Sequence, residues 1–181
     1  MHKRPTTTMT PAKSEQEIKI QFARRFGDIN ISLPKLRKLI KTVCLRFGKN
    51  EISESIETSS VKYEISITIV DDKEFKRINY EFLKRKSISD CLSFDLSENQ
   101  PGFPKTFELV INGQMALRQA KLRKHSSEAE FALYITHGLL HNFGFDDSEP
   151  AMAKNMHEKE DEILRELGYG FVYNKIKNTK K

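Results

Sequence analysis

The chain has 181 residues, with 38% hydrophobic and 31% charged side chains and a net charge of +6. This length and composition indicate one globular domain with one core and a strongly solvated surface. No apolar run is long enough to span a membrane and no signal-peptide core follows Met1, so we expect no membrane association. The modest positive charge is compatible with nucleic-acid binding but does not establish it.

The two ends differ from the middle of the chain. Residues 1–14 contain no acidic residue and several threonines, which favours a flexible tail, with an organelle-import signal as the alternative. Residues 15–170 are predicted to form the single domain, and residues 171–181 a basic tail. Cys44 and Cys91 lie in apolar patterns and are interpreted as reduced, buried thiols. We expect a monomer in the cytoplasm, or in an organelle of bacterial origin.

The first elements in chain order are a strand, a helix and a second strand. Ile18–Phe22 is a short strand candidate. Ser32 can cap a helix whose apolar residues recur at helical spacing up to Phe47, before a loop predicted over Gly48–Ser60. In Tyr63–Ile69 apolar and polar residues alternate, which predicts a strand with one buried face.

A short helix and a third strand follow. Asp71 and Asp72 begin the helix. Its predicted inner side carries Phe75, Ile78 and Phe82. Cys91–Leu96 is predicted to be a strand, and one of its faces carries Leu92, Phe94 and Leu96.

The next two elements are a fourth strand and a third helix. Leu109–Ile111 is a short strand candidate, and Asn112 can cap a helix that continues to about Leu122. Ser127 with Glu130 has the pattern of a capping box, which predicts the start of a further helix.

A last amphipathic helix begins near Pro150 and ends at Gly168. Its candidate core positions are Met152, Met156, Ile163 and Leu167. Strands and helices in this number and order predict an α+β fold, with a single small sheet of about four strands packed with about five helices.

The helix that contains two histidines is the most informative segment. From Phe131 to Phe143 it is apolar almost all round, which predicts a central, buried helix. His137 and His141 are four residues apart, so both imidazoles project from one face. Gly144 permits a left-handed turn that sends the chain back towards that face, where Asp147 arrives. Burying two imidazoles is unfavourable unless something pairs with them, so we predict a metal site of His137, His141 and Asp147.

Other interpretations of these residues exist. Two histidines at this spacing are a weak signal alone, and a histidine on an apolar helix is usually a satisfied core residue. Asp147 is also a candidate cap for the helix that begins near Glu149. His157 is a spare candidate ligand, interpreted as a surface residue. The combination of a buried helix, a glycine and a carboxylate at suitable offsets favours the metal site.

The residue beside the first histidine restricts the reaction. Zinc peptidases carry a glutamate base there, and Gly138 supplies no such group, which argues against peptide hydrolysis. Cleavage of RNA has a different requirement, because a metal can polarise a phosphoryl oxygen while nearby cations stabilise the transition state. Lys84 and Arg85 are the candidate catalytic cations. Ser93 either hydrogen-bonds a phosphate or only alternates on its strand. The RNA-binding candidates are Lys84, Arg85, Lys86 and Arg118.

The segment HGLLHNFGFDD, followed by a helix rich in Met and Glu, resembles the YbeY family of zinc-dependent endoribonucleases. The segment VDDKEFKRINYEFLKRKSISDCLSFDL is similar to that family's pattern of two acids, an asparagine-containing helix and a strand ending in Leu-Ser-Phe. The resemblance runs from about Glu17 to Gly168. It implies an α+β fold, one zinc ion, and cleavage of single-stranded RNA in the maturation and quality control of small-subunit ribosomal RNA, with the small ribosomal subunit as partner.

Two departures from the family pattern affect the predicted site. The family's third ligand is a histidine where this chain has Asp147, and its arginine falls at Leu83. Smaller changes are Ser89 for threonine and Phe107-Glu108 for Gly-Asp. Carboxylate binds zinc about as closely as imidazole, but two histidines and one carboxylate also resemble a non-haem iron triad. The alternatives are therefore a metal-dependent hydrolase or oxygenase of another substrate, and a ribosome-associated RNA-binding factor without catalysis.

Overall fold

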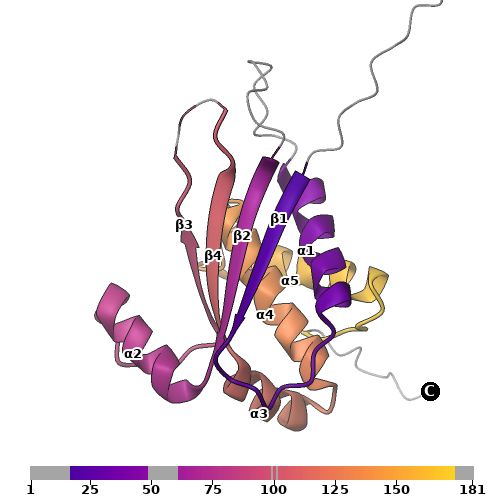
Figure 1. Cartoon of the computed structure of the whole chain (residues 1–181). Coiled ribbons are helices and arrows are strands. Elements are labelled where there is room, and N and C mark those ends of the chain that lie inside the picture. Colours follow the sequence, from indigo (N-terminus) through magenta and orange to yellow (C-terminus); the bar gives the residue numbers. More distant parts are fainter. Residues whose placement is uncertain (1–16, 49–60, 99, 101, 174–181) are drawn as a thin grey trace, which may run out of the picture.

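The computed structural model describes residues 17–48, 61–98, 100 and 102–173. These residues form an α+β fold of one four-stranded sheet and five helices, as predicted (Figure 1). The predicted tail 1–14, and most of the predicted loop 48–60 and basic tail 171–181, lie outside the described residues. Among the helices of the described ranges, none has the length and apolarity needed to cross a bilayer.

The sheet has the strand order β1-β2-β4-β3. β1 (Glu17–Arg24), β2 (Val61–Val70) and β4 (Lys105–Asn112) are mutually parallel, and the short β3 (Cys91–Asp95) lies antiparallel at the edge beside β4. β4 is longer than the predicted Leu109–Ile111, because pairing with β2 along its whole length holds residues whose own pattern is less apolar.

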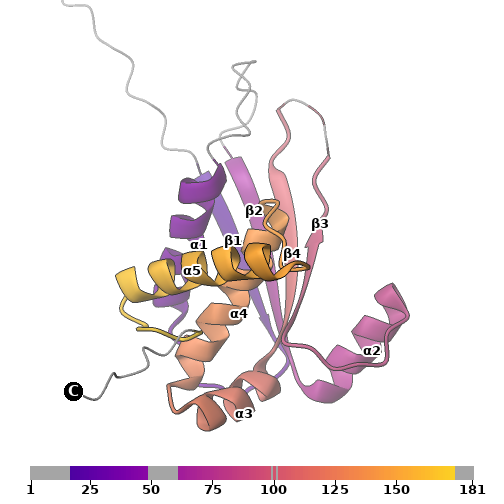
Figure 2. The ribbon, with the colours of Figure 1, turned by 180° about the vertical axis from the view of Figure 1, so that it is seen from behind.

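Three helices cover one face of the sheet: α1 (Leu33–Phe47), α4 (Ser127–Asn142) and α5 (Pro150–Glu166) (Figures 1 and 2). The main core lies between these helices and the sheet and includes Ile65, Ile67, Leu109, Phe131 and Ile135. α4 is the central helix of this layer, with α1 and α5 packed against it.

The other two helices lie near one end of the sheet. α2 (Asp72–Leu83) packs through Phe75 and Ile78 onto the opposite face, in a smaller cluster with strand residues Val70, Leu92 and Val110. α3 (Gly113–Arg123) follows β4 and packs against α4. The predicted caps Asp71 and Asn112 are confirmed, because their side chains accept hydrogen bonds from the backbone N–H groups of Glu74 and Met115.

The predicted capping box of α4 is wrong by one residue. Ser126, not Ser127, is the cap, and its hydroxyl oxygen accepts from the backbone N–H of Ala129. Glu130 is fully buried and binds Arg123 and His125 instead of the helix end. Two adjacent serines fit the cap position equally well in the sequence, so the pattern did not distinguish Ser126 from Ser127. The Glu130 side chain does not bind the helix end because it pairs with Arg123 and His125.

Three predicted core residues are exposed. Phe82 is 63% exposed, because only the earlier turns of α2 pack on the sheet. Leu96 is 55% exposed, since β3 ends at Asp95, whose carboxylate accepts from the backbone N–H of Ser97. Met152 is 50% exposed in the first turn of α5, ahead of the part of that helix that enters the core.

Candidate metal centre

α4 brings two imidazoles together at the boundary of the core. His137 and His141 lie one turn apart, and their Nε2 atoms are 3.1 Å from one another. Both side chains are partly exposed, at 19% and 31%. The same helix is buried on its other sides mainly by apolar residues, and the two imidazoles project from its partly exposed face.

The second nitrogen of each ring has its own acceptor. His137 Nδ1 lies 2.8 Å from Glu160 Oε1, and His141 Nδ1 lies 3.0 Å from the backbone oxygen of Phe145. A carboxylate and a carbonyl accept hydrogen bonds, so each Nδ1 carries the proton when the ring is neutral. The lone pairs of both Nε2 atoms then face the same point in space, which is the arrangement of two metal-ligating histidines.

A turn after α4 delivers the third group. Gly144 has a φ of +84°, a conformation that favours glycine, and it reverses the chain after the helix. The side chain of Asp146 accepts from the backbone N–H and hydroxyl of Ser148, which fixes the loop and holds the pKa of Asp146 below its usual range. Asp147 consequently points back, with its oxygens 3.7 and 3.8 Å from the Nε2 atoms of His137 and His141.

The ligand atoms of His137, His141 and Asp147 all lie within 4.8 Å of one another. Such a separation suits three ligands around one ion at zinc distances of about 2 Å. The donor set therefore fits a metal: two imidazoles held with free Nε2 atoms, and one carboxylate.

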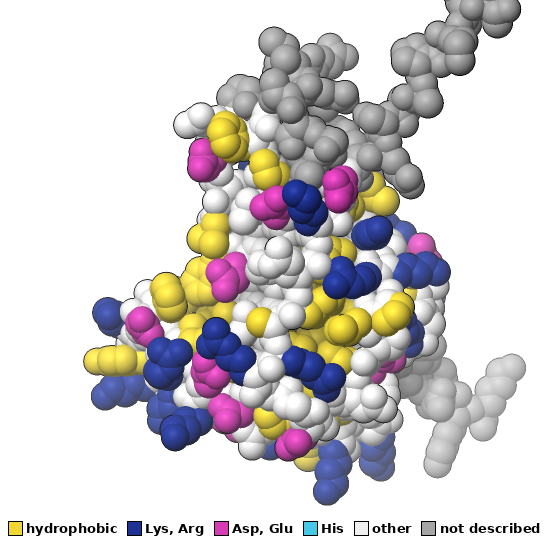
Figure 3. All heavy atoms as spheres, in the orientation of Figure 1, with side chains coloured by type: hydrophobic (Ala, Val, Ile, Leu, Met, Phe, Trp, Pro, Cys, Tyr) yellow, Lys and Arg dark blue, Asp and Glu magenta, His cyan; other side chains and the backbone are white. Residues whose placement is uncertain are grey.

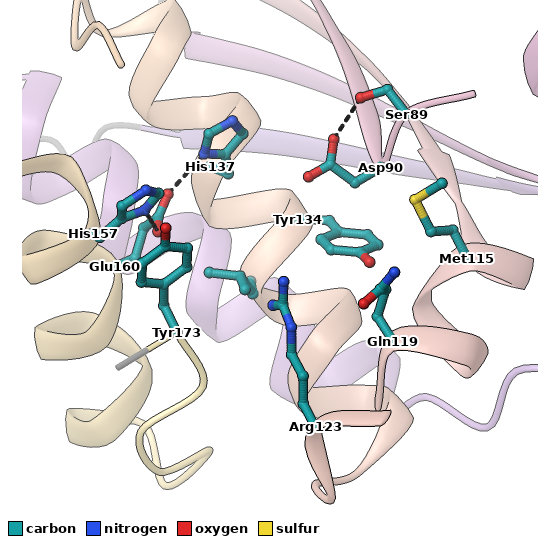
Figure 4. A pocket seen from close by; sticks show the side chains of 11 residues that line it. Ser89, Asp90, Met115, Gln119, Arg123, Tyr134, His137, His157, Glu160 and Tyr173 are labelled. Carbon is teal, nitrogen blue, oxygen red and sulfur yellow. Dashed lines mark hydrogen bonds and ion pairs between the residues drawn. The ribbon is translucent and has the colours of Figure 1, made fainter. Parts of the chain in front are cut away.

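Glu160 is the buried group behind this centre. It has no exposed surface, and its two oxygens lie 2.8 Å from the Nδ1 atoms of His137 and His157 (Figure 4). The interpretation of His157 as a surface residue is wrong, because its side chain is 16% exposed and its ring stacks on Tyr173 at 3.4 Å between centroids. His157 thus belongs to the support of the centre, one layer behind the ligands.

Glu160 also sets the charge preference of His137. Burial lowers the pKa of His137, but the hydrogen bond and negative charge of Glu160 outweigh it, so the pKa lies above the ordinary 6.5. This environment therefore favours the protonated imidazolium form of His137, or a cation bound next to its ring.

The glycine beside the first histidine has a packing role. A Cβ at Gly138 would lie 2.6 Å from both Cys91 Sγ and Leu109 Cδ2. The close approach of α4 to β3 and β4 therefore favours glycine, because a larger side chain at this position must displace the side chains of Cys91 and Leu109. Burial raises the pKa of Cys91 and that of Cys44, the latter to about 12, so both stay protonated thiols at neutral pH.

The predicted cations do not join the histidines. Lys84 and Arg85 follow α2, which packs on the opposite face of the sheet from α4, and the Nζ of Lys84 donates to the backbone oxygen of Glu81. Arg118 on α3 binds the carboxylate of Asp72 through both terminal nitrogens. Ser93 shares a face of β3 with Cys91, the side that meets α4.

The sequence profile described as Endoribonuclease YbeY matches residues 21–168. The chain belongs to this family. Three similar proteins are each named Endoribonuclease YbeY. A Myxococcus xanthus protein is 39% identical over 62% of this chain and 39% of its own length. One from Anaeromyxobacter is 38% identical over 58% of this chain and 55% of its own length. One from Coxiella burnetii is 32% identical over 86% of this chain and 97% of its own length. The chain thus spans about half or less of the first two relatives and nearly all of the third.

Sequence reasoning missed Glu160 although a signal was present. Glu160 lies four residues after Met156 and three before Ile163, both of which are fully buried, so it shares the inner face of α5 with them. A carboxylate on that face requires a partner, and the histidines of α4 are the nearest unsatisfied donors.

Proposed function

We propose that this protein is a metal-dependent endoribonuclease that cleaves single-stranded RNA, with precursors of small-subunit ribosomal RNA as its substrate and the cytoplasm as its site of action. The observation that carries the proposal is the convergence of two Nε2 lone pairs and one carboxylate, each imidazole being fixed through its other nitrogen. Membership of the YbeY family, whose relatives are named endoribonucleases, supports RNA as the substrate.

His137, His141 and Asp147 would hold one Zn²⁺, His137 and His141 through Nε2 and Asp147 through its carboxylate. A bound zinc ion supplies Lewis acidity towards a phosphoryl oxygen and an acidified water for attack on the phosphodiester. The chain would thereby supply three of the four ligands that zinc usually takes, which would leave one for the substrate or water.

The protein's own groups orient this centre and set its charge. Glu160 and the Phe145 carbonyl hold the Nδ1 protons and keep both rings turned towards the ligand point. Asp147 contributes a negative charge where the family has a neutral histidine. We therefore expect a less acidic water here than a three-histidine site would produce.

α2 is the proposed RNA-binding surface. Exposed lysines of the helix are Lys73 and Lys76, the segment that follows it carries Lys84, Arg85 and Lys86, and Figure 3 shows basic side chains gathered over this region. Tyr80 and Phe82 are 51% and 63% exposed on the same helix. Cations that neutralise phosphates beside aromatic rings that stack bases are typical of proteins that bind single strands. We assign Lys84 and Arg85 to this binding surface, and Ser93 to the face of the metal centre.

Metal analysis and cleavage assays test the proposal together. We expect about one zinc per chain after purification, and cleavage of an unstructured RNA oligonucleotide that a His137→Ala, His141→Ala double variant no longer performs. Asp147→Asn should weaken metal binding, whereas the neighbouring Asp146→Asn, which keeps the acceptor for Ser148, should retain it. Metal retained in the double variant would show that the centre lies elsewhere. Full metal with intact RNA would contradict the nuclease proposal, and iron instead of zinc would favour an oxygenase.

A further inference from the structure

A cavity of about 310 Å³ adjoins the metal centre and shares His137 with it (Figure 4). α4 contributes Tyr134 and His137, α3 contributes Gln119 and Arg123, and Asp90 enters from the start of β3. This volume lies at the lower end of the range for small-molecule sites, about 300 to 1,000 Å³. Because the cavity and the metal centre share His137, an RNA phosphate at the centre would place an adjacent nucleotide within reach of the cavity.

The walls of the cavity suit a flat ring. The ring of Tyr134 lies in the middle of the lining, and Tyr173 stands on the opposite side beside His157. Tyr173 is held in place, because its backbone N–H donates to Asp161 Oδ1 at 3.0 Å and its ring stacks on His157. Aromatic rings beside fixed polar groups suit the binding of heteroaromatic ligands, which combine a flat ring with hydrogen-bonding edges.

Asp90 offers a fixed acceptor to this cavity. Its Oδ1 accepts from the Ser89 hydroxyl at 2.7 Å and from the backbone N–H of Cys91 at 2.8 Å. Within the described part of the chain, no hydrogen bond is made to Oδ2, and Figure 4 shows the carboxylate directed towards the cavity. The carboxylate is thus oriented by two donors on one oxygen while the other is available to a ligand.

Arg123 offers a donor from the other side. Its Nη1 donates to Glu130 Oε1 at 3.0 Å, and Glu130 is fully buried, so the guanidinium is anchored at one end. In Figure 4 the Arg123 side chain extends towards Tyr134, on the opposite side of the cavity from Asp90. Gln119 adds an amide that can both donate and accept.

We propose that this cavity binds a nucleobase with an exocyclic amino group, which donates to Asp90 Oδ2 while a neighbouring acceptor on the base meets Arg123 or Gln119. The proposal rests on the nuclease function and deepens it. A phosphate is the weaker fit, because Asp90 Oδ2 faces the cavity as a carboxylate oxygen and Arg123 is already paired with Glu130. Uracil lacks the amino group and turns a carbonyl oxygen towards the Asp90 carboxylate, so it is disfavoured.

Calorimetric titration of the zinc-loaded full chain with CMP and UMP tests this proposal, since cytosine has an amino group beside an N3 acceptor where uracil has a carbonyl beside an N3–H donor. We expect CMP to bind about tenfold more tightly than UMP, because one oxygen facing a carboxylate leaves both acceptors unpaired. Asp90→Asn keeps an acceptor for Ser89 and Cys91 but replaces Oδ2 by a donor, so the preference should vanish or reverse. The exposed Asp28→Asn is the matched control and should keep it.

A second variant tests the cavity independently of Asp90. Gln119→Phe fills the cavity and should weaken both nucleotides about tenfold or more. Equal binding of CMP and UMP, no binding of either, a preference that survives Asp90→Asn, or full binding to Gln119→Phe would each overturn the proposal. The titration needs no cleavage, so RNA cleavage without base preference refutes this inference alone. A CMP preference without RNA cleavage refutes the nuclease function instead.

Discussion

The Nε2 atoms of His137 and His141 lie 3.1 Å apart although both rings already donate through Nδ1. Two neutral imidazoles arranged in this way present acceptor to acceptor, and the Asp147 carboxylate adds further negative potential less than 4 Å from each of them. A proton or a metal ion between these atoms removes the repulsion. The electrostatics of the centre therefore favour a bound positive charge, which the sequence motif alone did not reveal.

Zinc should raise the thermal stability of the protein. A ligand that binds only the folded state at about 100 times its dissociation constant adds about 2.7 kcal/mol, which corresponds to a Tm increase of about 5 to 10 °C for a domain of this size. We expect this increase in thermal melts that compare added zinc with added EDTA. The His137→Ala, His141→Ala variant should show no increase, and an equal increase in that variant would place the bound zinc at another site.

Glu160 should control metal affinity without touching the metal. Glu160→Gln keeps the size of the side chain but removes the charge that holds the Nδ1 protons of His137 and His157. Loss of such a supporting carboxylate typically lowers metal affinity about 10- to 100-fold. A competition titration against a fluorescent zinc chelator measures it. Glu162→Gln on the same helix, with a 49% exposed side chain, is the matched control and should bind zinc normally.

Opposite pH dependences are expected with and without metal. The pKa of His137 is raised in the folded protein, because Glu160 outweighs burial. Its protonation therefore stabilises the metal-free protein fully below the ordinary pKa of 6.5, and this contribution disappears as the pH rises through the raised value. Zinc needs the unprotonated Nε2, so its binding strengthens over the same range.

The difference in Tm between zinc-treated and EDTA-treated protein should consequently widen from pH 6 to pH 8. Melts at several pH values measure this difference. In Glu160→Gln the pKa of His137 loses its main source of elevation, so the metal-free protein should depend less on pH. A constant difference in Tm across this range in the wild-type protein would contradict the proposed coupling between proton and metal.

Local pattern was enough to group His137, His141 and Asp147 into one candidate centre, because the three residues belong to one continuous segment. His137 and His141 follow from helical spacing, and Gly144 and Asp147 follow from the turn that must end a buried helix. Glu160 was missed because it reaches the centre from another helix, and only tertiary packing joins α5 to α4.

The misplaced core residues have a related cause. Periodicity predicts which face of an element is apolar, but it gives no information on how far the neighbouring layer extends. Phe82 lies on the apolar side of α2 beyond the end of the sheet contact, where its ring meets only the edge-strand residue Phe94 among the described rings, 5.7 Å away. Met152 precedes the buried part of α5 in the same way.

Gly138→Ala should destabilise the fold rather than the chemistry. The added methyl group would lie 2.6 Å from side-chain atoms of Cys91 and Leu109, so either these side chains or α4 itself must shift. Overpacking of this kind costs about 1 to 3 kcal/mol of unfolding free energy. Urea denaturation measures it. Gly27→Ala, where the added methyl meets nothing within 4 Å, is the matched control and should be nearly neutral. An unchanged free energy of unfolding in Gly138→Ala would show that the packing of α4 against β3 and β4 adjusts to the added methyl group.

Asp147→His tests the position at which the resemblance to the family leads us to expect a histidine. The loop fixed by Gly144 and the Asp146–Ser148 turn aims residue 147 at the two Nε2 atoms, so a histidine there should still reach the ion. Replacing a carboxylate by a neutral imidazole raises the net charge of the centre by one unit and makes a bound water more acidic. We expect zinc to be retained, RNA cleavage to be equal or faster, and the rate to reach its plateau at a lower pH than in the wild-type protein. Metal analysis and a pH–rate profile measure these outcomes. Loss of zinc in Asp147→His, with zinc retained in Asp147→Ala, would show that Asp147 is not the third ligand.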